Sequence, residues 1–382
     1  MTQLNQTSRV QALDILRGLV MVLMAIDHVR VYSGIPAGGP AFGIFITRWV
    51  THFCAPAFVF FAGTSAFLYG LKVVNIKSLK SFLISRGLLL IILEFTFIRF
   101  CWTFNFDYGS FTLAGVIWML GCSMIFLSFI VNLKPMAITI IGLVIVFFQQ
   151  FFGLIPKLLP DGLAESFSRV WSFVYPSALP GADGITILYV LVPWIGVIAA
   201  GYGFGALLLM EPSKRNSWCL KIGLGATALF LVAAILLASL NENPNNIPLL
   251  IRVLSQQKYP ASQLFLLMTL GPMIALIPFA DRLRGWFADV LNIFGKVPMF
   301  YYLLHIPLIH VLALITNLIL TGVTNQEFYR TAPYVSVPPE NRWNLSLLYL
   351  IFVVSVFLLY FACKWYVRFK ENNRHLLWTK YI

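Results

Sequence analysis

Residues 13–30 read LDILRGLVMVLMAIDHVR, a stretch that is long and apolar enough for a membrane-spanning helix. It nevertheless carries five ionisable side chains: Asp14, Arg17, Asp27, His28 and Arg30. A charged group inside the hydrocarbon of a bilayer is costly, so such side chains normally face the interior of a helix bundle or a wet cavity. The stretch therefore predicts a helix at the centre of a membrane bundle, with a polar site beside it.

The composition of the whole chain supports a membrane protein. Of its 382 residues, 59% are hydrophobic and 11% are charged, whereas soluble domains have about 45–50% apolar and about 25% charged residues. The formal net charge of +13 does not indicate nucleic-acid binding, because most basic residues lie in short loops between apolar runs, where they set membrane topology. We expect the lipid bilayer as a partner and no nucleic acid.

Ten segments are long enough to cross a bilayer core of about 30 Å as helices. They are residues 11–32, 48–71, 81–100, 110–131, 136–155, 185–209, 218–239, 262–280, 297–320 and 344–368. The fifth is the least regular, because FFQQFFG at 147–153 is typical of a membrane interface. The pattern predicts an all-α polytopic membrane helix bundle of about ten transmembrane helices, forming one domain over residues 1–382.

The distribution of Lys and Arg predicts the topology of this bundle. If the N-terminus is cytoplasmic, the inner loops hold most of the basic residues, as the positive-inside rule requires. Both termini are then cytoplasmic, and the long connections 156–184, 240–261 and 321–343 lie outside. We expect a multi-pass protein of the cell membrane, in a bacterium the inner membrane.

Helical spacing places Asp14, Arg17 and His28 on one face of the first segment, since each residue turns the helix by about 100°. Arg17 and His28 are then about 16 Å apart along the axis, one near the cytoplasm and one near the outside. Asp27 and Arg30 project in other directions. An alternative interpretation is an Asp14–Arg17 ion pair at the inner interface and a solvated His28 at the outer one.

Further histidines fall near the same membrane side. His52 begins the second segment at its outer end, where solvation at the interface would also explain it. His305 and His310 lie within the ninth segment, and Pro307 between them releases a backbone carbonyl, which can open a polar site inside a span. His305 could instead bond to a neighbouring helix as a structural contact.

The remaining polar residues and motifs have plainer interpretations. Glu94 and Arg99 in the third segment could form an inter-helix network with Arg86. His305 and His310 are about 140° apart around a helix and cannot share one ion as an i, i+4 pair can, so we expect no metal. Small residues such as Gly201 and Gly205 indicate close helix packing and permit association into a homodimer.

Several motifs together resemble a known family. R-x-x-x-L-D-x-x-R-G-L-x-x-x-L-M at residues 9–24, followed by APAFVFFAGTS at 55–65, looks like the membrane catalytic domain of heparan-alpha-glucosaminide N-acetyltransferase and its bacterial relatives. The similarity continues through SRGLLLIILE, VIWMLGCSM, VPWIGVIAAGYGFG, KYPASQLFLLMTLGP and FGKVPMFYYLLHIPLIH. It therefore covers nearly the whole chain.

The resemblance implies an acyltransferase of ten or eleven helices. Such an enzyme takes an acyl group, acetyl above all, from acyl-CoA on the cytoplasmic side and delivers it to an acceptor on the far side, often a sugar amine or hydroxyl of a glycan. The residues expected at the CoA-binding site are Asp14, Arg17 and Arg86, with the basic side chains of Arg17 and Arg86 holding the phosphates and Asp14 beside Arg17 near the CoA entrance. The residues expected to take part in catalysis are His28, His305, His52 and Asp27, with His28 as the base.

The chain departs from the family pattern at one point. In the lysosomal enzyme the catalytic histidine lies in the loop between the first two spans, and the position matching His28 is an asparagine. The corresponding loop here, VYSGIPAGGPAFGIFIT at 31–47, contains no histidine, so His28 or His52 would have to take its place. Two other hypotheses stay open: a transporter or flippase that uses the same buried groups, and a non-catalytic scaffold.

Overall fold

The structure is a computed structural model that describes residues 11–37, 41–109, 111–176, 185–243, 245–373 and 375–381. It is 75% helical. The α-helices are α1 (Gln11–Tyr32), α2 (Phe42–Trp49), α3 (Cys54–Gly70), α4 (Ile76–Leu93), α5 (Arg99–Thr103), α6 (Val116–Ile130), α7 (Pro135–Phe147), α8 (Asp161–Trp171), α9 (Trp194–Leu207), α10 (Pro212–Leu240), α11 (Leu249–Leu254), α12 (Gln263–Ala275), α13 (Ile277–Arg282), α14 (Trp286–Lys296), α15 (Pro298–Thr321) and α16 (Leu345–Asn372).

Shorter elements connect these helices. They are the 3-10 helices η1 (Val50–Phe53), η3 (Gln149–Leu158), η4 (Gln326–Tyr329), η5 (Pro339–Asn341) and η6 (Leu377–Lys380), and the π-helix η2 (Glu94–Ile98). The strands β1 (Leu113–Ala114) and β2 (Thr186–Ile187) form one short parallel pair. The prediction of an all-α polytopic bundle is confirmed. Arg9, with which the first family motif begins, lies outside the described residues.

Each of the ten predicted segments contains a helix, but not every helix has the length and composition of a membrane span. Among the described residues, six helices or continuous runs of two or three helices meet both conditions, and a seventh is present if α7 and η3 are taken as one span bent by 68°. The bend follows Phe147, where FFQQFFG begins. Helices α6 and α9 are short, and α1 carries several charges. The count of ten spans and the cytoplasmic position of both termini stay predictions.

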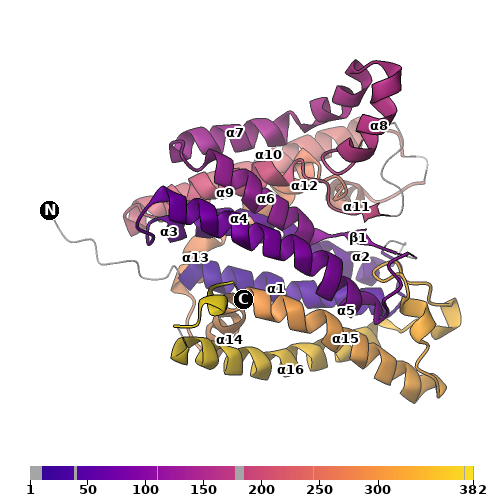
Figure 1. The fold of residues 1–382 in the computed structure, drawn as a ribbon. Coiled ribbons are helices and arrows are strands. Elements are labelled where there is room, and N and C mark those ends of the chain that lie inside the picture. Colours follow the sequence, from indigo (N-terminus) through magenta and orange to yellow (C-terminus); the bar gives the residue numbers. More distant parts are fainter. Residues whose placement is uncertain are drawn as a thin grey trace.

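Helix α1 lies inside the bundle, with α3 and α4 on one side and α15 and α16 on the other (Figure 1). It also packs against α13 and α14, and most of its residues are buried. Its crossing with α14 is close, because a Cβ added at Gly18 would overlap the carbonyl oxygen of Leu291. The helix with the most unusual charges is therefore a core helix, as its sequence predicts.

A second set of helices packs around α3 and α4. Helix α9 lies against both α3 and α7, α6 lies against α4, and α12 lies against α10. At the α3–α9 crossing a Cβ on Gly201 would overlap the carbonyl group of Phe60, and one on Gly205 would press on the ring of Phe67. The small residues of α9 therefore allow close packing against α3 within the chain. The homodimer stays a prediction, and this motif does not support it.

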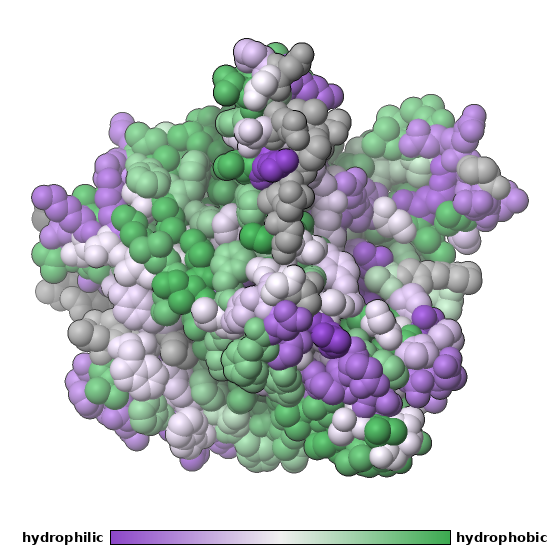
Figure 2. All heavy atoms as spheres, turned by 45° about the vertical axis from the view of Figure 1, so that its right-hand side comes forward, coloured by the Kyte–Doolittle hydropathy of each residue, from purple (hydrophilic) through white to green (hydrophobic). Residues whose placement is uncertain are grey.

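The outer surface of the bundle is largely apolar. Figure 2 shows broad hydrophobic areas on this face, with hydrophilic residues at the left edge, on the upper-right lobe and in a group right of the centre. Helices α10 and α16 contribute strongly exposed aliphatic side chains, among them Val232, Leu236 and Val353. Surfaces of this kind fit lipid rather than water.

Two buried charged residues have structural partners. The carboxylate of Glu94 in η2 accepts hydrogen bonds from the backbone N–H groups of Ile117 and Trp118, both at 2.9 Å. These N–H groups lie in the first turn of α6, where no intrahelical acceptor is available. Arg99 donates to the Phe111 carbonyl at 3.2 Å. Glu94 and Arg99 are thus satisfied by separate groups and not by each other, contrary to the network that we considered.

Candidate functional site

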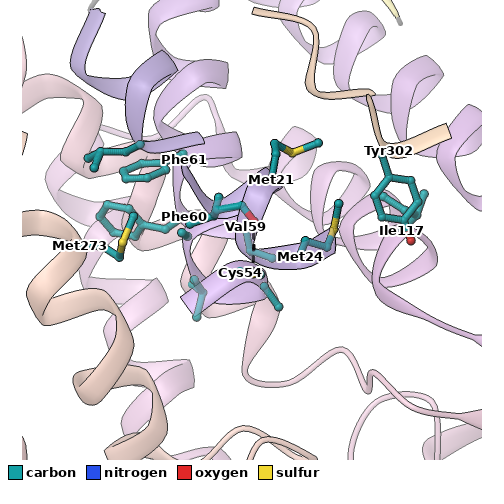
Figure 3. Packing of buried hydrophobic residues seen from close by; sticks show 14 of the residues in the cluster. Met21, Met24, Cys54, Val59, Phe60, Phe61, Ile117, Met273 and Tyr302 are labelled. Atoms are coloured by element: carbon teal, nitrogen blue, oxygen red, sulfur yellow. Dashed lines mark hydrogen bonds between the residues drawn. The ribbon is translucent and has the colours of Figure 1, made fainter. Parts of the chain in front are cut away.

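A cavity of about 930 Å³ runs through the centre of the bundle. Its walls come mainly from α1, α3, α4, α6 and α15. Figure 3 shows six of the apolar lining residues, Met21 and Met24 of α1, Cys54 and Val59 of α3, Ile117 of α6 and Tyr302 of α15. The volume lies within the range of small-molecule and cofactor sites, about 300–1,000 Å³.

His28 and His305 meet at one side of this cavity. The distance from His28 Nδ1 to His305 Nε2 is 2.6 Å, and the two rings stack with centroids 4.8 Å apart. The Trp102 ring lies edge-on to His28 at 4.9 Å. His28 is half-buried and lines the cavity, whereas His305 is fully buried behind it.

The hydrogen bonds of His305 determine which ring nitrogens carry protons. His305 Nδ1 lies 2.6 Å from the Tyr302 carbonyl oxygen and 3.2 Å from that of Tyr301. Carbonyl oxygens only accept, so Nδ1 of His305 carries the hydrogen and, in the neutral ring, its Nε2 accepts. His28 Nδ1 must then donate to that nitrogen. With both rings neutral, the lone pair of His28 lies on Nε2, which has no hydrogen-bond partner among the described residues.

Pro307 has a smaller role than the sequence predicts. It lies inside α15, which continues through it. A proline releases the carbonyl four residues earlier, which is that of Leu303. His305 is held instead by the carbonyls of Tyr301 and Tyr302. The polar site on α15 therefore depends on the reach of the His305 side chain and not on the released carbonyl.

The far end of the cavity is basic. Asp14, Arg17 and Arg86 all line it, together with Lys72 and Arg215. Asp14 and Arg17 form the predicted i, i+3 ion pair, with 3.3 Å between their nearest charged atoms. The ion pair of the alternative interpretation therefore forms, and its two residues also border the cavity, whereas their expected role in CoA binding stays a prediction.

Arg17 also links two helices at this end. Its guanidinium donates to the carbonyl oxygen of Phe61 at 3.1 Å and to the Ser65 hydroxyl, both on α3. Arg86 on α4 lies over the Phe82 ring, with its guanidinium carbon 5.8 Å from the ring centroid. Arg17 of α1, Arg86 of α4 and Arg215 of α10 thus bring positive charge to one end of the cavity.

Asp27 and His52, the other two predicted catalytic residues, are placed differently from His28. Asp27 lines the cavity, but its carboxylate is held by Arg30 at 3.0 Å and not by His28. His52 is 7% exposed and is not among the cavity-lining residues. Neither of its ring nitrogens has a hydrogen-bond partner among the described residues, and its ring contacts Phe265 edge-on at 5.4 Å.

His310 lies away from the cavity. Its Nδ1 is 3.1 Å from the Cys101 carbonyl oxygen and its Nε2 is 3.1 Å from the side-chain oxygen of Gln326. These contacts join α15 to α5 and η4, so His310 has a structural role. Within the described ranges, no three His, Cys, Asp or Glu side chains come together as a metal site would require.

Lys258 is a lining residue that the sequence analysis did not select. It precedes α12, and its side chain is 8% exposed and lines the cavity with Asp27 and His28. Tyr189 lines the same cavity, and its hydroxyl is 3.4 Å from that of Tyr259. A single lysine in a loop gives no sequence signal of burial, because most lysines in loops are solvated.

Comparison with known proteins identifies one matching family. The family model described as heparan-alpha-glucosaminide N-acetyltransferase, catalytic, matches residues 9–233. This region includes His28 and the basic end of the cavity, whereas Lys258 and His305 lie beyond it. The comparison with curated proteins found no match for the chain.

Proposed function

Since the chain belongs to the heparan-alpha-glucosaminide N-acetyltransferase catalytic family, whose function is of the transmembrane acetyltransferase type, we propose that it moves an acetyl group from cytoplasmic acetyl-CoA to an extracytoplasmic amine or hydroxyl, such as that of a glycan. One observation carries this proposal: the same cavity is lined by a basic cluster at one end and, near the other, by the His28 imidazole, whose Nε2 has no hydrogen-bond partner among the described residues.

The basic end of the cavity suits the nucleotide part of the donor. CoA carries several phosphates, and Arg and Lys side chains recognise phosphate through charge-assisted hydrogen bonds. Arg17 and Arg86 are joined there by Lys72 and Arg215. Asp14 positions Arg17 through their ion pair, and this is the role we assign to it. A long apolar passage past Met21 and Met24 then suits the flexible arm that ends in the thioester.

His28 has the geometry of a general base. Its Nδ1–H is tied to His305, and this bond orients the ring and fixes the tautomer, while Nε2 is left to take a proton. The backbone carbonyls of Tyr301 and Tyr302 accept from Nδ1 of His305 and so hold the ring that orients His28. The logic is that of a nucleophile, a base and an orienting group, with the acceptor substrate supplying the nucleophile.

The same cavity could in principle serve a transporter. A transporter site would bind and release its substrate unchanged, and it would need no oriented base. The short His28–His305 bond and the family membership both favour the enzyme. The two functions are separated by chemistry, because only the enzyme breaks the thioester and releases CoA.

The direct experiment is to purify the full chain in detergent and follow the release of free CoA thiol from acetyl-CoA, with glucosamine, which carries no anionic group, as the acceptor. We expect turnover by the wild-type chain and a loss of about 10²–10⁴-fold in kcat for His28→Ala, which is the usual contribution of general-base catalysis. A matched control is His375→Ala, since His375 is exposed and follows α16. Unchanged turnover in His28→Ala would remove the assigned role of His28.

A further inference from the structure

Lys258 is a buried cation at the acceptor side of the cavity. It lies in the connection between α11 and α12, where a backbone bridge to Ala261 fixes its position. Its side chain is 92% buried, since only 8% is exposed, and it lines the cavity with His28 and Asp27. The family match ends at residue 233, so nothing in that match assigns a role to Lys258.

No carboxylate of the described residues lies within ion-pair distance of Lys258. Among the described residues it forms no ion pair within 4.0 Å, and Asp27, the acidic residue nearest to it in the cavity wall, is already held by Arg30 at 3.0 Å. The Lys258 ammonium nitrogen lies 5.2 Å from the centroid of the Tyr259 ring. Burial alone would lower the pKa of Lys258, but Tyr259 and Asp27 outweigh this effect and raise the pKa above its usual value. The side chain is therefore charged at neutral pH.

A buried cation that no carboxylate contacts directly is costly for a fold, and cations in such positions usually serve function. Acyl transfer is accelerated by a hydrogen-bond donor or a positive group beside the thioester carbonyl oxygen, because negative charge develops on this oxygen as the acceptor attacks. Lys258 and His28 interact electrostatically and line the same cavity. A thioester next to His28 Nε2 would therefore lie within the field of the Lys258 ammonium.

We propose that Lys258 is a catalytic residue that donates a hydrogen bond to the thioester carbonyl oxygen and stabilises the oxyanion formed during transfer. This inference rests on the proposed function. The acceptor amine or hydroxyl attacks the carbonyl carbon, His28 Nε2 takes its proton, and the carbonyl π electrons move to the oxygen beside Lys258. When the oxyanion collapses, the C–S bond breaks, and the proton on His28 passes to the leaving thiolate to give free CoA thiol.

A different use of Lys258 makes a different kinetic prediction. If the lysine only bound an anionic group on the acceptor, its removal would raise KM for an anionic acceptor and would have no effect with an acceptor that lacks such a group. If it stabilises the oxyanion, its removal lowers kcat for every acceptor, including glucosamine, which has no anionic group. The split between kcat and KM with glucosamine therefore distinguishes the two roles.

The test compares Lys258→Met and Lys258→Arg with the control Lys157→Met, a change at an exposed lysine. Acetyl-CoA binding is measured in parallel by calorimetry, which also reports folding of each variant. With glucosamine, we expect kcat of Lys258→Met to fall about 10²–10³-fold, the usual effect of losing an oxyanion donor. We expect Lys258→Arg to retain more activity, and acetyl-CoA affinity to stay within about two-fold of wild type in both.

Two results would overturn the inference while leaving the proposed function intact: kcat unchanged in Lys258→Met, or a loss confined to KM of an anionic acceptor. A wild-type chain that binds acetyl-CoA but never releases free CoA with any acceptor would contradict the proposed function, and the inference would fall with it. Wild-type turnover is measured separately from the variants, so the two failures are distinguishable.

Discussion

Nδ1 of His28 lies 2.6 Å from Nε2 of His305, although 277 residues separate them in the chain. The contact joins the core helix α1 to α15, and it joins the part of the chain that matches the family model to a part beyond the match. Because the carbonyls of Tyr301 and Tyr302 fix the proton on His305 Nδ1, this contact also determines which nitrogen of His28 can act on a substrate.

The first prediction concerns the orienting role of His305. His305→Ala removes the acceptor of His28 Nδ1–H, so the His28 ring loses its tautomer and its orientation, and we expect kcat to fall by about 10²–10⁴-fold. His305→Gln keeps an acceptor oxygen near the same place and should retain more activity. Steady-state kinetics of both variants check this, with KM for acetyl-CoA near the wild-type value. Equal activity in the two variants would remove the orienting role.

The second prediction concerns the basic end of the cavity. Arg17→Gln should raise KM and Kd for acetyl-CoA by about 10-fold or more, because a charge-assisted hydrogen bond to phosphate contributes about 1.5–3 kcal/mol. The value of kcat at saturation should change little. Ser65→Ala is the matched control, since it removes one partner of Arg17 and leaves the positive charge. An unchanged Kd in Arg17→Gln, measured by calorimetry, would place the phosphates elsewhere.

The third prediction concerns His52. The structure buries this ring without any hydrogen-bond partner among the described residues and away from the cavity wall. Replacing an unsatisfied buried polar group by an apolar one of similar shape is neutral or stabilising. His52→Phe should therefore keep wild-type turnover and an equal or higher unfolding temperature in detergent. A large drop in kcat with normal folding would return His52 to the catalytic site.

The fourth prediction concerns the crossing of α1 with α14. Gly18→Ala places a Cβ against the Leu291 carbonyl oxygen, and overpacking of this kind destabilises a fold by about 1–3 kcal/mol. We expect a clearly lower unfolding temperature. Gly225→Ala in α10 is the control, because a Cβ there meets no atom within 4 Å and alanine favours helix. If both variants unfold at the same temperature, the close crossing is absent.

The general fold could be predicted from the sequence, because hydrophobic runs and loop charges report directly on the bilayer. The predicted family is also confirmed by the match over residues 9–233. The number of membrane spans could be predicted less well from the sequence. Helices α6 and α9 are short for a bilayer, and the charges of α1 hide a core helix from a test based on hydropathy. The short helices α6 and α9 pack against longer neighbours, and the charged helix α1 packs in the core of the bundle. Such packing is not encoded in local hydropathy.

The candidate site could be predicted only in part. The face shared by Asp14, Arg17 and His28 follows from the helical repeat, and all three line the cavity. The contact of His28 with His305 depends on how two distant helices cross, which no local pattern encodes. The burial of Lys258 depends on the path of a loop. The pairing of Asp27 with Arg30 was open to prediction from the i, i+3 spacing.

The most direct test of the central claim uses proteoliposomes that contain the purified chain. Glucosamine is sealed inside, and acetyl-CoA with a labelled acetyl group is added outside. The account predicts labelled N-acetylglucosamine in the lumen, an equal amount of free CoA thiol outside, and neither product with His28→Ala. Intact acetyl-CoA collecting in the lumen, with no CoA thiol released on either side, would show a transporter and contradict the account.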